Sequence, residues 1–439
     1  MQNKKSLNEV AILAGGRGTR LNLSDIPKPL APICNIPILE YLIYLCRENG
    51  YKNILLLVQY LSNQIYDYFG DGSKFQVNIS YIEEKNPLGT GGAVMNSIDQ
   101  MEDNFLVLYA DTYAEVNLKK MFKFHIDNNS ECTIFIHPND HPIDSDIVEC
   151  DQNYDVINIF PYPHDDSLLK RNLVNAALYV FNKKTLKRNI YSSSKFDIAK
   201  DYLPFLIKKK VRIKGYKSVE YIKDMGTPYR QKKVENDIVS ELPLKLSDKV
   251  RRKAIFIDRD GTINQDFGHI RSPDQIELIE KSAQAIKSFN NAGFLVIVIT
   301  NQPVLARGEC SFGVLEEIHA KLEIMLGNYG AYLDDILFCP HHPDKGFDGE
   351  VSELKKKCLC RKPESGLINL AIKKYNIDLA DSWLIGDMTS DIELANRLSI
   401  KSILVRSGFA GKDRKFKSEP DYIVDNLFKA SKIILYSSE

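Results

Sequence analysis

Residues 10–21 read VAILAGGRGTRL, an apolar run of strand length that leads directly into a glycine-rich turn. Residues 254–263, AIFIDRDGTI, place a second apolar run before a pair of aspartates in the other half of the chain. In open α/β sheets, polar residues at the carboxyl ends of strands face the ligand crevice. The two stretches therefore predict two α/β sheets, each with a functional site where its first strand ends.

Further apolar runs follow each stretch and alternate with longer helical patterns, as in parallel-sheet α/β folds. They lie at 54–58, 105–109 and 133–136 in the first half, and at 295–299, 383–385 and 402–405 in the second. With 439 residues, the chain exceeds the roughly 250 to 300 residues at which a single hydrophobic core stops growing. We expect a first domain over 1–240, a polar linker over 241–252 and a second domain over 253–439.

Composition argues against several classes of partner. Lysine plus arginine equal aspartate plus glutamate at 58 each, so no overall positive field attracts a nucleic acid or an anionic membrane. The apolar runs 10–13 and 294–299 are too short for a signal-peptide core or a membrane span. We expect a cytoplasmic protein with neither a nucleic-acid nor a membrane partner, and the sequence is compatible with a homo-oligomer.

The first turn combines glycines with positive charges. Glycines directly after a strand allow backbone N–H groups to approach a polyphosphate, and the cations supply countercharge. The spacing is neither that of a P-loop nor that of the dinucleotide fingerprint, because Leu21 stands where a third glycine belongs. We expect a triphosphate to bind to Gly15, Gly16, Arg17, Gly18, Thr19, Arg20 and Lys28, the last of these being also the predicted catalytic residue.

Two aspartates complete the predicted chemistry of this half. Asp111 ends the apolar run 105–110, and Asp224 begins the stretch DMGTP at 224–228. Nucleotidyl transfer requires the charge on the α-phosphate and pyrophosphate to be neutralised, usually by Mg²⁺ held between carboxylates. Without further context, each aspartate also fits a turn or a helix cap.

The first half resembles the sugar-1-phosphate nucleotidyltransferase family over roughly 9–235. The matching stretches are LAGGRGTRL at 13–21, PKPL at 27–30, PLGTGGA at 87–93, NAA at 175–177 and DMGTP at 224–228. The resemblance implies a Rossmann-like fold with a mixed sheet, nucleoside contacts from 88–92 through Gly89, Thr90 and Gly91, and Mg²⁺ on Asp111 and Asp224. A lysine that many members use for the sugar phosphate has no counterpart at 160–164, and Lys170 or Arg171 are the candidates to replace it.

In the second half, Asp258 and Asp260 suit a phosphatase. A carboxylate can attack a phosphate ester, and a second one two residues on can protonate the leaving alkoxide and later activate water. Later apolar runs lead to Thr300 and Asn301, suited to phosphate oxygens, and to Asp387, with Asp391 four residues on as a further carboxylate. Arg361 and Lys362 lie between these runs and carry charge for a phosphate.

This order of motifs resembles the haloacid dehalogenase (HAD) superfamily over about 253–424. The resemblance implies a Rossmann-like parallel sheet, Asp258 as nucleophile, Asp260 as general acid and base, and Thr300 and Lys362 as phosphate ligands. Magnesium is expected on Asp387 with Asp258, and Asp260 is counted among its ligands.

Three cysteines and a histidine suggest a metal loop in the same half. Cys339, His341, Cys358 and Cys360 form a C-x-H and C-x-C set, and three thiolates with one imidazole suit a closed, structural zinc site. His342 is a competing ligand. The set narrows the likeness to the phosphatases of D-glycero-D-manno-heptose 1,7-bisphosphate and of histidinol phosphate, and the stretch TNQPVLARG at 300–308 favours the former.

The two halves then fit one sequence of reactions. Removal of the 7-phosphate leaves heptose 1-phosphate, which a nucleotidyltransferase can consume. The first half is most similar to the guanylyltransferases of heptose 1-phosphate, which favours GTP over ATP, CTP, UTP or dTTP. The alternatives are a hexose-1-phosphate nucleotidyltransferase joined to a histidinol-phosphate type of phosphatase, or one half that is a non-catalytic regulatory domain.

Overall fold

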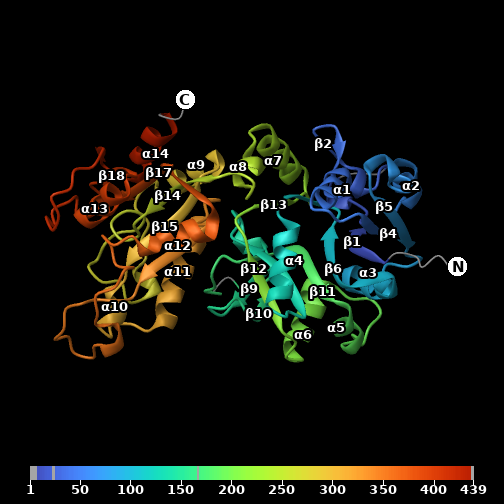
Figure 1. Cartoon of the computed structure of the whole chain (residues 1–439), viewed down its shortest axis with the longest axis horizontal. Helices are drawn as coiled ribbons and strands as arrows, with labels where there is room; N and C mark the ends of the chain where they lie inside the picture. The colour runs from blue at the N-terminus through green and yellow to red at the C-terminus, as the bar shows by residue number, and fades with distance from the viewer. Residues whose placement is uncertain (1–6, 22–24, 166–167, 437–439) are drawn as a thin grey trace. The chain divides into compact units, whose positions relative to one another are not determined.

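The computed structural model describes residues 7–21, 25–165 and 168–436, and the chain forms two compact units (Figure 1). The first unit takes the chain up to residue 137, then 146–163 and 173–247. The second takes 138–145, 164–172 and the chain from 248 on. Two short segments of the expected first domain thus group with the second unit, and the units change over inside the expected linker.

The first unit is built on a nine-stranded mixed sheet. Its main path runs β10-β9-β11-β6-β1-β4-β5, and β8 pairs with both β11 and β12. Strand β1 is parallel to β4 and β6, whereas β11 is antiparallel to β6 and β8. The strands are β1 (Asn8–Ala14), β4 (Asn53–Val58), β5 (Asn78–Glu83), β6 (Met101–Tyr109), β8 (Cys132–His137), β9 (Ile147–Cys150), β10 (Val156–Phe160), β11 (Val174–Asn182) and β12 (Ile213–Lys217).

Both faces of this sheet are buried, which explains why its central strands are almost continuously apolar. Val10 and Ile12 pack into one core cluster, and Ala11 between them packs into another, as expected when successive side chains alternate across a strand. The helices of the unit are α1 (Ile38–Glu48), α2 (Ser62–Phe69), α3 (Gly89–Ser97), α4 (Leu118–Asp127), α5 (Lys183–Arg188), α6 (Leu203–Lys208), α7 (Pro228–Val239) and α8 (Leu242–Leu246).

A small antiparallel ribbon lies beside the main sheet of the first unit. It pairs β7 (Thr112–Glu115) with β13 (Tyr221–Asp224), and Asp224 is opposite Thr112 in the register. This ribbon brings the two predicted magnesium aspartates together, although they are more than a hundred residues apart in the chain.

The second unit contains a six-stranded, entirely parallel sheet in the order β16-β15-β14-β17-β18-β19. Its strands are β14 (Arg252–Ile257), β15 (Leu295–Asn301), β16 (Asp335–Cys339), β17 (Ile377–Gly386), β18 (Lys401–Val405) and β19 (Tyr422–Val424). Strand β14 is central, so the motif that follows it lies in the middle of the carboxyl edge. The predicted fold class, a mixed-sheet unit followed by a parallel-sheet unit, is confirmed.

Helices cover both faces of the parallel sheet. They are α9 (Ser282–Ala292), α10 (Pro303–Ala306), α11 (Phe312–Gly327), α12 (Gly366–Tyr375), α13 (Thr389–Leu398) and α14 (Leu427–Tyr436). Helices α9 and α14 pack side by side (Figure 1). Within the described ranges, none of the helices has the length and apolar character that crossing a membrane requires.

Candidate active sites

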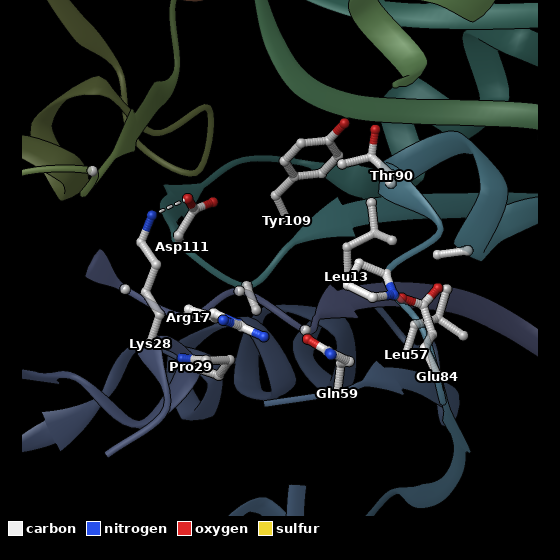
Figure 2. Close-up of a pocket in the computed structure, with 18 of the residues that line it drawn as sticks. Leu13, Arg17, Lys28, Pro29, Leu57, Gln59, Glu84, Thr90, Tyr109 and Asp111 are labelled. Atoms are coloured by element: carbon white, nitrogen blue, oxygen red, sulfur yellow. Dashed lines mark hydrogen bonds and ion pairs between the residues drawn. The ribbon is translucent and has the colours of Figure 1, made fainter. Parts of the chain in front are cut away.

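A pocket of about 420 Å³ opens in the first unit where β1 and β6 end (Figure 2). Its wall includes most of the predicted triphosphate loop, namely Gly15, Gly16, Arg17, Gly18, Arg20 and Lys28. A side chain at Gly15 would come within 3.2 Å of the Cβ atom of Gln59, so glycine lets the loop run close to the end of β4. The side chain of Thr19 lies outside the described residues.

Lys28 and Asp111 form an ion pair at one end of this pocket (Figure 2). The Lys28 side chain is only 11% exposed. The backbone of Asp111 is fixed as well, since its carbonyl accepts a hydrogen bond of 2.8 Å from the Met225 N–H. The catalytic lysine and the first magnesium aspartate of the sequence analysis are therefore in direct contact.

Asp224 lies at the adjoining strand end and is held by another cation. Arg230 donates to both of its carboxylate oxygens, at 2.9 and 2.8 Å, and the Gly226 N–H donates to one of them at 3.1 Å. Arg20 comes close to Gly226 too. Two carboxylates on neighbouring strand ends fit the oxygen preference of Mg²⁺, which takes its remaining ligands from water and substrate phosphates.

The glycine-rich segment 87–93 contributes to the pocket only in part. Gly89 and Thr90 line it, whereas Gly91 turns towards Phe196. The Gly91 N–H donates to the Phe196 carbonyl at 3.0 Å, and a side chain on Gly91 would come within 2.2 Å of the Phe196 ring. The predicted nucleotide contact of Gly91 is thus replaced by a packing role, because that glycine makes room for an aromatic ring.

Sequence reasoning missed Glu84, which lines the pocket at the end opposite Lys28 and Asp111 (Figure 2). One of its carboxylate oxygens is buried and has no hydrogen-bond partner among the residues that the structure describes. Burial raises the pKa of this carboxyl, and a hydrogen bond from the Leu88 backbone opposes the rise. The buried oxygen needs a donor, and a nucleotide base in the pocket can supply one.

Arg171 does not replace the missing sugar-phosphate lysine. Its guanidinium donates to Glu323 on α11 at 2.8 Å and to Glu316 at 2.9 Å, within the second unit. The Asn172 N–H also donates to Glu323, at 2.8 Å. Arg171 therefore anchors the segment 164–172, and of the two candidates Lys170 remains.

In the second unit, the motifs meet at the carboxyl edge of the sheet. The carboxylate oxygens of Asp258, Asp387 and Asp391 lie within 4.8 Å of one another, and all three residues are buried. Lys362 reaches this group with its ammonium, 2.9 Å from Asp258 and 2.6 Å from Asp391. The structure thus brings together the predicted nucleophile, the phosphate lysine and the motif around Asp387, although they come from distant parts of the chain.

Lys362 compensates only part of the negative charge of these three buried carboxylates. Burial raises the pKa of Asp258, which Lys362 opposes and Asp391 reinforces. Burial also raises the pKa of Asp387, and the charges of Asp258 and Asp391 add to it. One oxygen of Asp387 accepts from the Phe409 N–H at 2.6 Å, and the other has no partner among the described residues. Three carboxylates whose negative charge is only partly balanced fit a divalent cation such as Mg²⁺.

Asp260 is held apart from this carboxylate group. The fully buried Arg259 donates to both of its oxygens, at 3.0 and 2.8 Å, and Asn264 and Gln302 donate at 3.0 Å each. Although burial alone raises the pKa of Asp260, Arg259 brings it below its usual value. The group of carboxylates that could hold a metal thus contains Asp391, and Asp260, which we expected there, lies outside it.

Thr300 and Asn301 both line the second pocket but differ in role. The Asn301 side chain accepts from the Lys362 N–H at 3.0 Å and donates to the Lys362 carbonyl at 3.3 Å. It thus fixes the backbone that carries the phosphate lysine. The Thr300 hydroxyl accepts from the Gln302 side chain at 2.8 Å. Its own proton is therefore available to donate to another acceptor, such as a phosphate oxygen.

Cys339, His341, Cys358 and Cys360 form a compact cluster. The sulfur–sulfur distances are 3.3 to 3.5 Å, and the His341 Nδ1 atom is 3.3 Å from the Cys360 sulfur. With metal–sulfur bonds of about 2.3 Å the sulfurs of a tetrahedral site are about 3.8 Å apart, so the cluster has the size of such a site and is slightly tighter than an occupied one. His342 instead accepts from the Asp344 N–H at 3.3 Å, so the geometry favours His341 as the ligand.

The pocket over the carboxylate group has a volume of about 880 Å³, and away from that group its lining carries more basic than acidic residues, the acidic ones being Asp266 and Glu364. Near the reactive end it is lined by Asp258, Asp260, Thr300 and Lys362. Its other basic lining residues are Arg307, Lys357, Arg361 and Lys415, together with His269 and His342. The pocket therefore offers charge for more than one anionic group of a ligand.

Comparison with known proteins assigns each half to a family. Residues 9–239 match the Nucleotidyl transferase family, and residues 359–430 match the HAD-hydrolase-like family. A Haemophilus ducreyi protein, D-glycero-beta-D-manno-heptose-1,7-bisphosphate 7-phosphatase, is 38% identical over 36% of this chain and 86% of its own length. A Photorhabdus laumondii protein named for the alpha anomer is 37% identical over 42% of this chain and 96% of its own length.

Two solved structures are similar to the separate halves. HddC from Yersinia pseudotuberculosis, in complex with GMP-PN, is 29% identical, with a TM-score of 0.46 over 53% of this chain and all of its own. The D,D-heptose 1,7-bisphosphate phosphatase from B. bronchiseptica, in complex with magnesium and phosphate, is 32% identical, with a TM-score of 0.38 over 42% of this chain and 99% of its own.

Proposed function

Since the chain belongs to the nucleotidyl transferase family and its second half to the HAD-type phosphatases, we propose that it makes a nucleotide-activated heptose in two steps. The second half removes the 7-phosphate from D-glycero-D-manno-heptose 1,7-bisphosphate. The first half then transfers a nucleotidyl group, with GMP favoured, to heptose 1-phosphate and releases pyrophosphate. We place both steps in the cytoplasm, where nucleoside triphosphates are supplied.

In the phosphatase step, Asp258 attacks the phosphorus of the 7-phosphate and forms an acyl phosphate, while the ester oxygen leaves with a proton from Asp260. Because Arg259 lowers the pKa of Asp260, Asp260 must take up this proton when the phosphate of the substrate binds. Asp260 then takes a proton from the water that hydrolyses the acyl phosphate. Lys362 and Thr300 bind the phosphate oxygens. A magnesium ion held by Asp258, Asp387 and Asp391 would neutralise the charge of the phosphoryl group.

In the transfer step, an oxygen of the sugar 1-phosphate attacks the α-phosphorus of the triphosphate, and the bond to pyrophosphate breaks. Lys28, Arg17 and Arg20 supply positive charge along the phosphates, and the loop 15–18 brings backbone N–H groups to them. Magnesium held by Asp111 and Asp224 would balance the charge on the departing pyrophosphate.

One observation favours a bisphosphate over histidinol phosphate. Away from the motif aspartates, the second pocket is lined by the basic residues Arg307, Lys357, Arg361 and Lys415 and by the acidic residues Asp266 and Glu364, and this surplus of positive charge suits a second phosphate. Histidinol phosphate presents an ammonium and an imidazole there, and like charges disfavour it. The test is phosphate release from both anomers of the bisphosphate and from histidinol phosphate. Faster release from histidinol phosphate would contradict the proposal.

The unpaired oxygen of Glu84 supports GTP. Guanine presents two adjacent N–H donors, and a carboxylate can accept both, whereas adenine, cytosine and uracil each present one donor beside an acceptor. A bidentate contact of this kind discriminates between bases by about 1 to 3 kcal/mol. We propose that Glu84 reads the guanine edge.

Glu84→Gln is accordingly expected to lower kcat/KM for GTP by about 10- to 100-fold and to leave that for ATP nearly unchanged. Pyrophosphate release with each triphosphate measures the ratio. Glu83→Gln is the matched control, because Glu83 is exposed and accepts from Ser62 at 2.7 Å. If Glu84→Gln lowers kcat/KM equally for GTP and for ATP, base recognition by Glu84 is excluded.

We propose zinc as the metal of the cysteine cluster, with a structural role. Cys360 precedes Lys362 by two residues, and the Gln302 N–H donates to the Cys339 carbonyl at 2.8 Å. The cluster thus fixes the position of both segments that carry the predicted phosphate ligands, the one with Lys362 and the one with Thr300. Loss of the metal should disturb the position of Lys362 as well as stability.

Cys360→Ser is expected to lower bound zinc well below one equivalent and phosphatase activity by about 10- to 100-fold, while nucleotidyl transfer persists. Metal analysis and both assays on the same preparation measure this. Cys310→Ser serves as control, since Cys310 lies in the same unit and outside the cluster. Full phosphatase activity in zinc-free Cys360→Ser would show that the metal does not support the site.

A further inference from the structure

The loop between Cys339 and Cys358 packs against the segment that carries Arg307. The Val351 N–H donates to the Ala306 carbonyl at 3.0 Å. Gly308 has a positive φ of 71°, and a side chain there would come within 1.9 Å of the Gly349 carbonyl. Such close approach of two backbones requires glycine. The chain from 346 to 351 is therefore a fixed neighbour of Arg307.

Phe347 of this loop is the aromatic partner of Arg307. The guanidinium carbon lies 4.3 Å from the centre of the Phe347 ring, within the range of a cation–π contact. Lys355 approaches the same ring at 4.5 Å with a side chain that is 1% exposed. His342 meets the ring edge-on, with centroids 6.0 Å apart. Phe347 is thus packed into a basic part of the pocket wall.

The loop itself is tied down. The Gly346 and Phe347 N–H groups donate to one oxygen of Glu350, at 3.0 and 3.1 Å. The same oxygen lies 3.5 Å from the Lys355 ammonium. Cys339 and Cys358 bound the loop on either side. The ring of Phe347 therefore has a defined place before any ligand binds.

A second contact, with His269, also orients the Arg307 guanidinium. His269 contacts Glu309 through Nδ1 at 2.7 Å and Arg307 through Nε2 at 3.0 Å. These contacts suit a neutral imidazole that donates from Nδ1 and accepts at Nε2 from the guanidinium. The Nε atom of Arg307 is buried and has no hydrogen-bond partner among the described residues. The guanidinium is held in position while part of its donor capacity remains free.

We propose that Phe347 is a positioning residue, which holds the Arg307 guanidinium in place to bind the second phosphate of the substrate. The inference rests on the proposed bisphosphate activity. A second basic residue of this wall, Arg361, is fixed differently, since it donates to the His341 carbonyl at 3.1 Å. Among the arginine and lysine residues that line the pocket, Arg307 is the one described in contact with the Phe347 ring. The loop between Cys339 and Cys358 would thus determine which substrate binds, in addition to stabilising the protein.

Phe347→Leu tests this, because leucine keeps an apolar side chain and removes the ring. We expect kcat/KM for heptose 1,7-bisphosphate to fall about tenfold through KM, with kcat/KM for p-nitrophenyl phosphate unchanged. Phe347→Tyr keeps the ring and should retain the wild-type ratio of kcat/KM for heptose 1,7-bisphosphate to kcat/KM for p-nitrophenyl phosphate. Phe312→Leu is the matched control, since Phe312 is 52% exposed and does not line the pocket.

Arg307→Met separates this inference from the function on which it rests. We expect it to lower the same ratio further than Phe347→Leu, and the double variant to behave like Arg307→Met alone. If Arg307→Met leaves the ratio unchanged, binding of the second phosphate by Arg307 is wrong. If Arg307→Met lowers it and Phe347→Leu does not, or if Phe347→Leu slows both substrates equally, only the role of Phe347 is overturned.

Discussion

Asp258→Asn is expected to reduce phosphate release by at least about a thousandfold, because an amide cannot form the acyl phosphate. Asp258 lies 2.9 Å from the Lys362 ammonium and within the buried carboxylate group, the position proposed for the nucleophile. Transfer from GTP to supplied heptose 1-phosphate should be unaffected. Both activities are measured on one preparation, as released phosphate and released pyrophosphate.

The control for this variant is Asp274→Asn, an exposed carboxylate in the same unit. It should leave both activities unchanged. Loss of nucleotidyl transfer in Asp258→Asn, in a protein that remains folded, would contradict two independent sites. Retention of phosphatase activity would contradict the assignment of the nucleophile.

Asp111→Asn is expected to have the opposite pattern. It removes the charge that pairs with Lys28 and one of the two proposed magnesium carboxylates, so transfer should fall by about 100- to 1,000-fold, the range seen when one charge-stabilising group is removed from an active site. Phosphatase activity should persist, because Asp111 is remote in sequence from every residue of the second sheet. Added Mg²⁺ should restore little, since a ligand is missing.

Asp103→Asn is the matched control for Asp111→Asn, because Asp103 is an exposed carboxylate on β6, the strand that leads to Asp111. Wild-type transfer in Asp111→Asn would show that this carboxylate does not serve the reaction. Equal loss in Asp103→Asn would indicate damage to the strand and not to the site.

Much of the fold follows from short-range pattern. The apolar runs at 10–14 and 254–257 became buried central strands, because continuous apolar strands are stable only where helices cover both faces of a sheet. Once these strands are parallel to their neighbours, the residues after them must lie at one edge. The meeting of Asp258 with Asp387, which follows β17, is a consequence of that geometry.

Contacts between segments distant in sequence could not be predicted in the same way. Gly91 looked like part of a nucleotide loop, and only the packing of Phe196 on it shows otherwise. Arg171 seemed free to bind a sugar phosphate until the structure placed Glu323 beside it. Asp391 joins the carboxylate group of Asp258 and Asp387, whereas Asp260 pairs with Arg259 instead.

Glu84 shows what a sequence signal could have revealed. It stands just after the edge strand β5 and three residues before the stretch 87–93 that the family resemblance marked as nucleoside-binding. A carboxylate at the end of β5 follows the same strand-end rule that identified Asp111. What no pattern could supply is that one of its oxygens is buried without a partner.

The most direct test of the account supplies heptose 1,7-bisphosphate, GTP and Mg²⁺ to the whole chain and follows phosphate and pyrophosphate over time. We predict that phosphate appears first, that pyrophosphate follows after a lag, and that the product is a GDP-heptose. In Asp258→Asn neither should appear from the bisphosphate, while heptose 1-phosphate should still yield pyrophosphate. Release of pyrophosphate from the bisphosphate without prior release of phosphate would contradict the order of the two reactions and the account built on it.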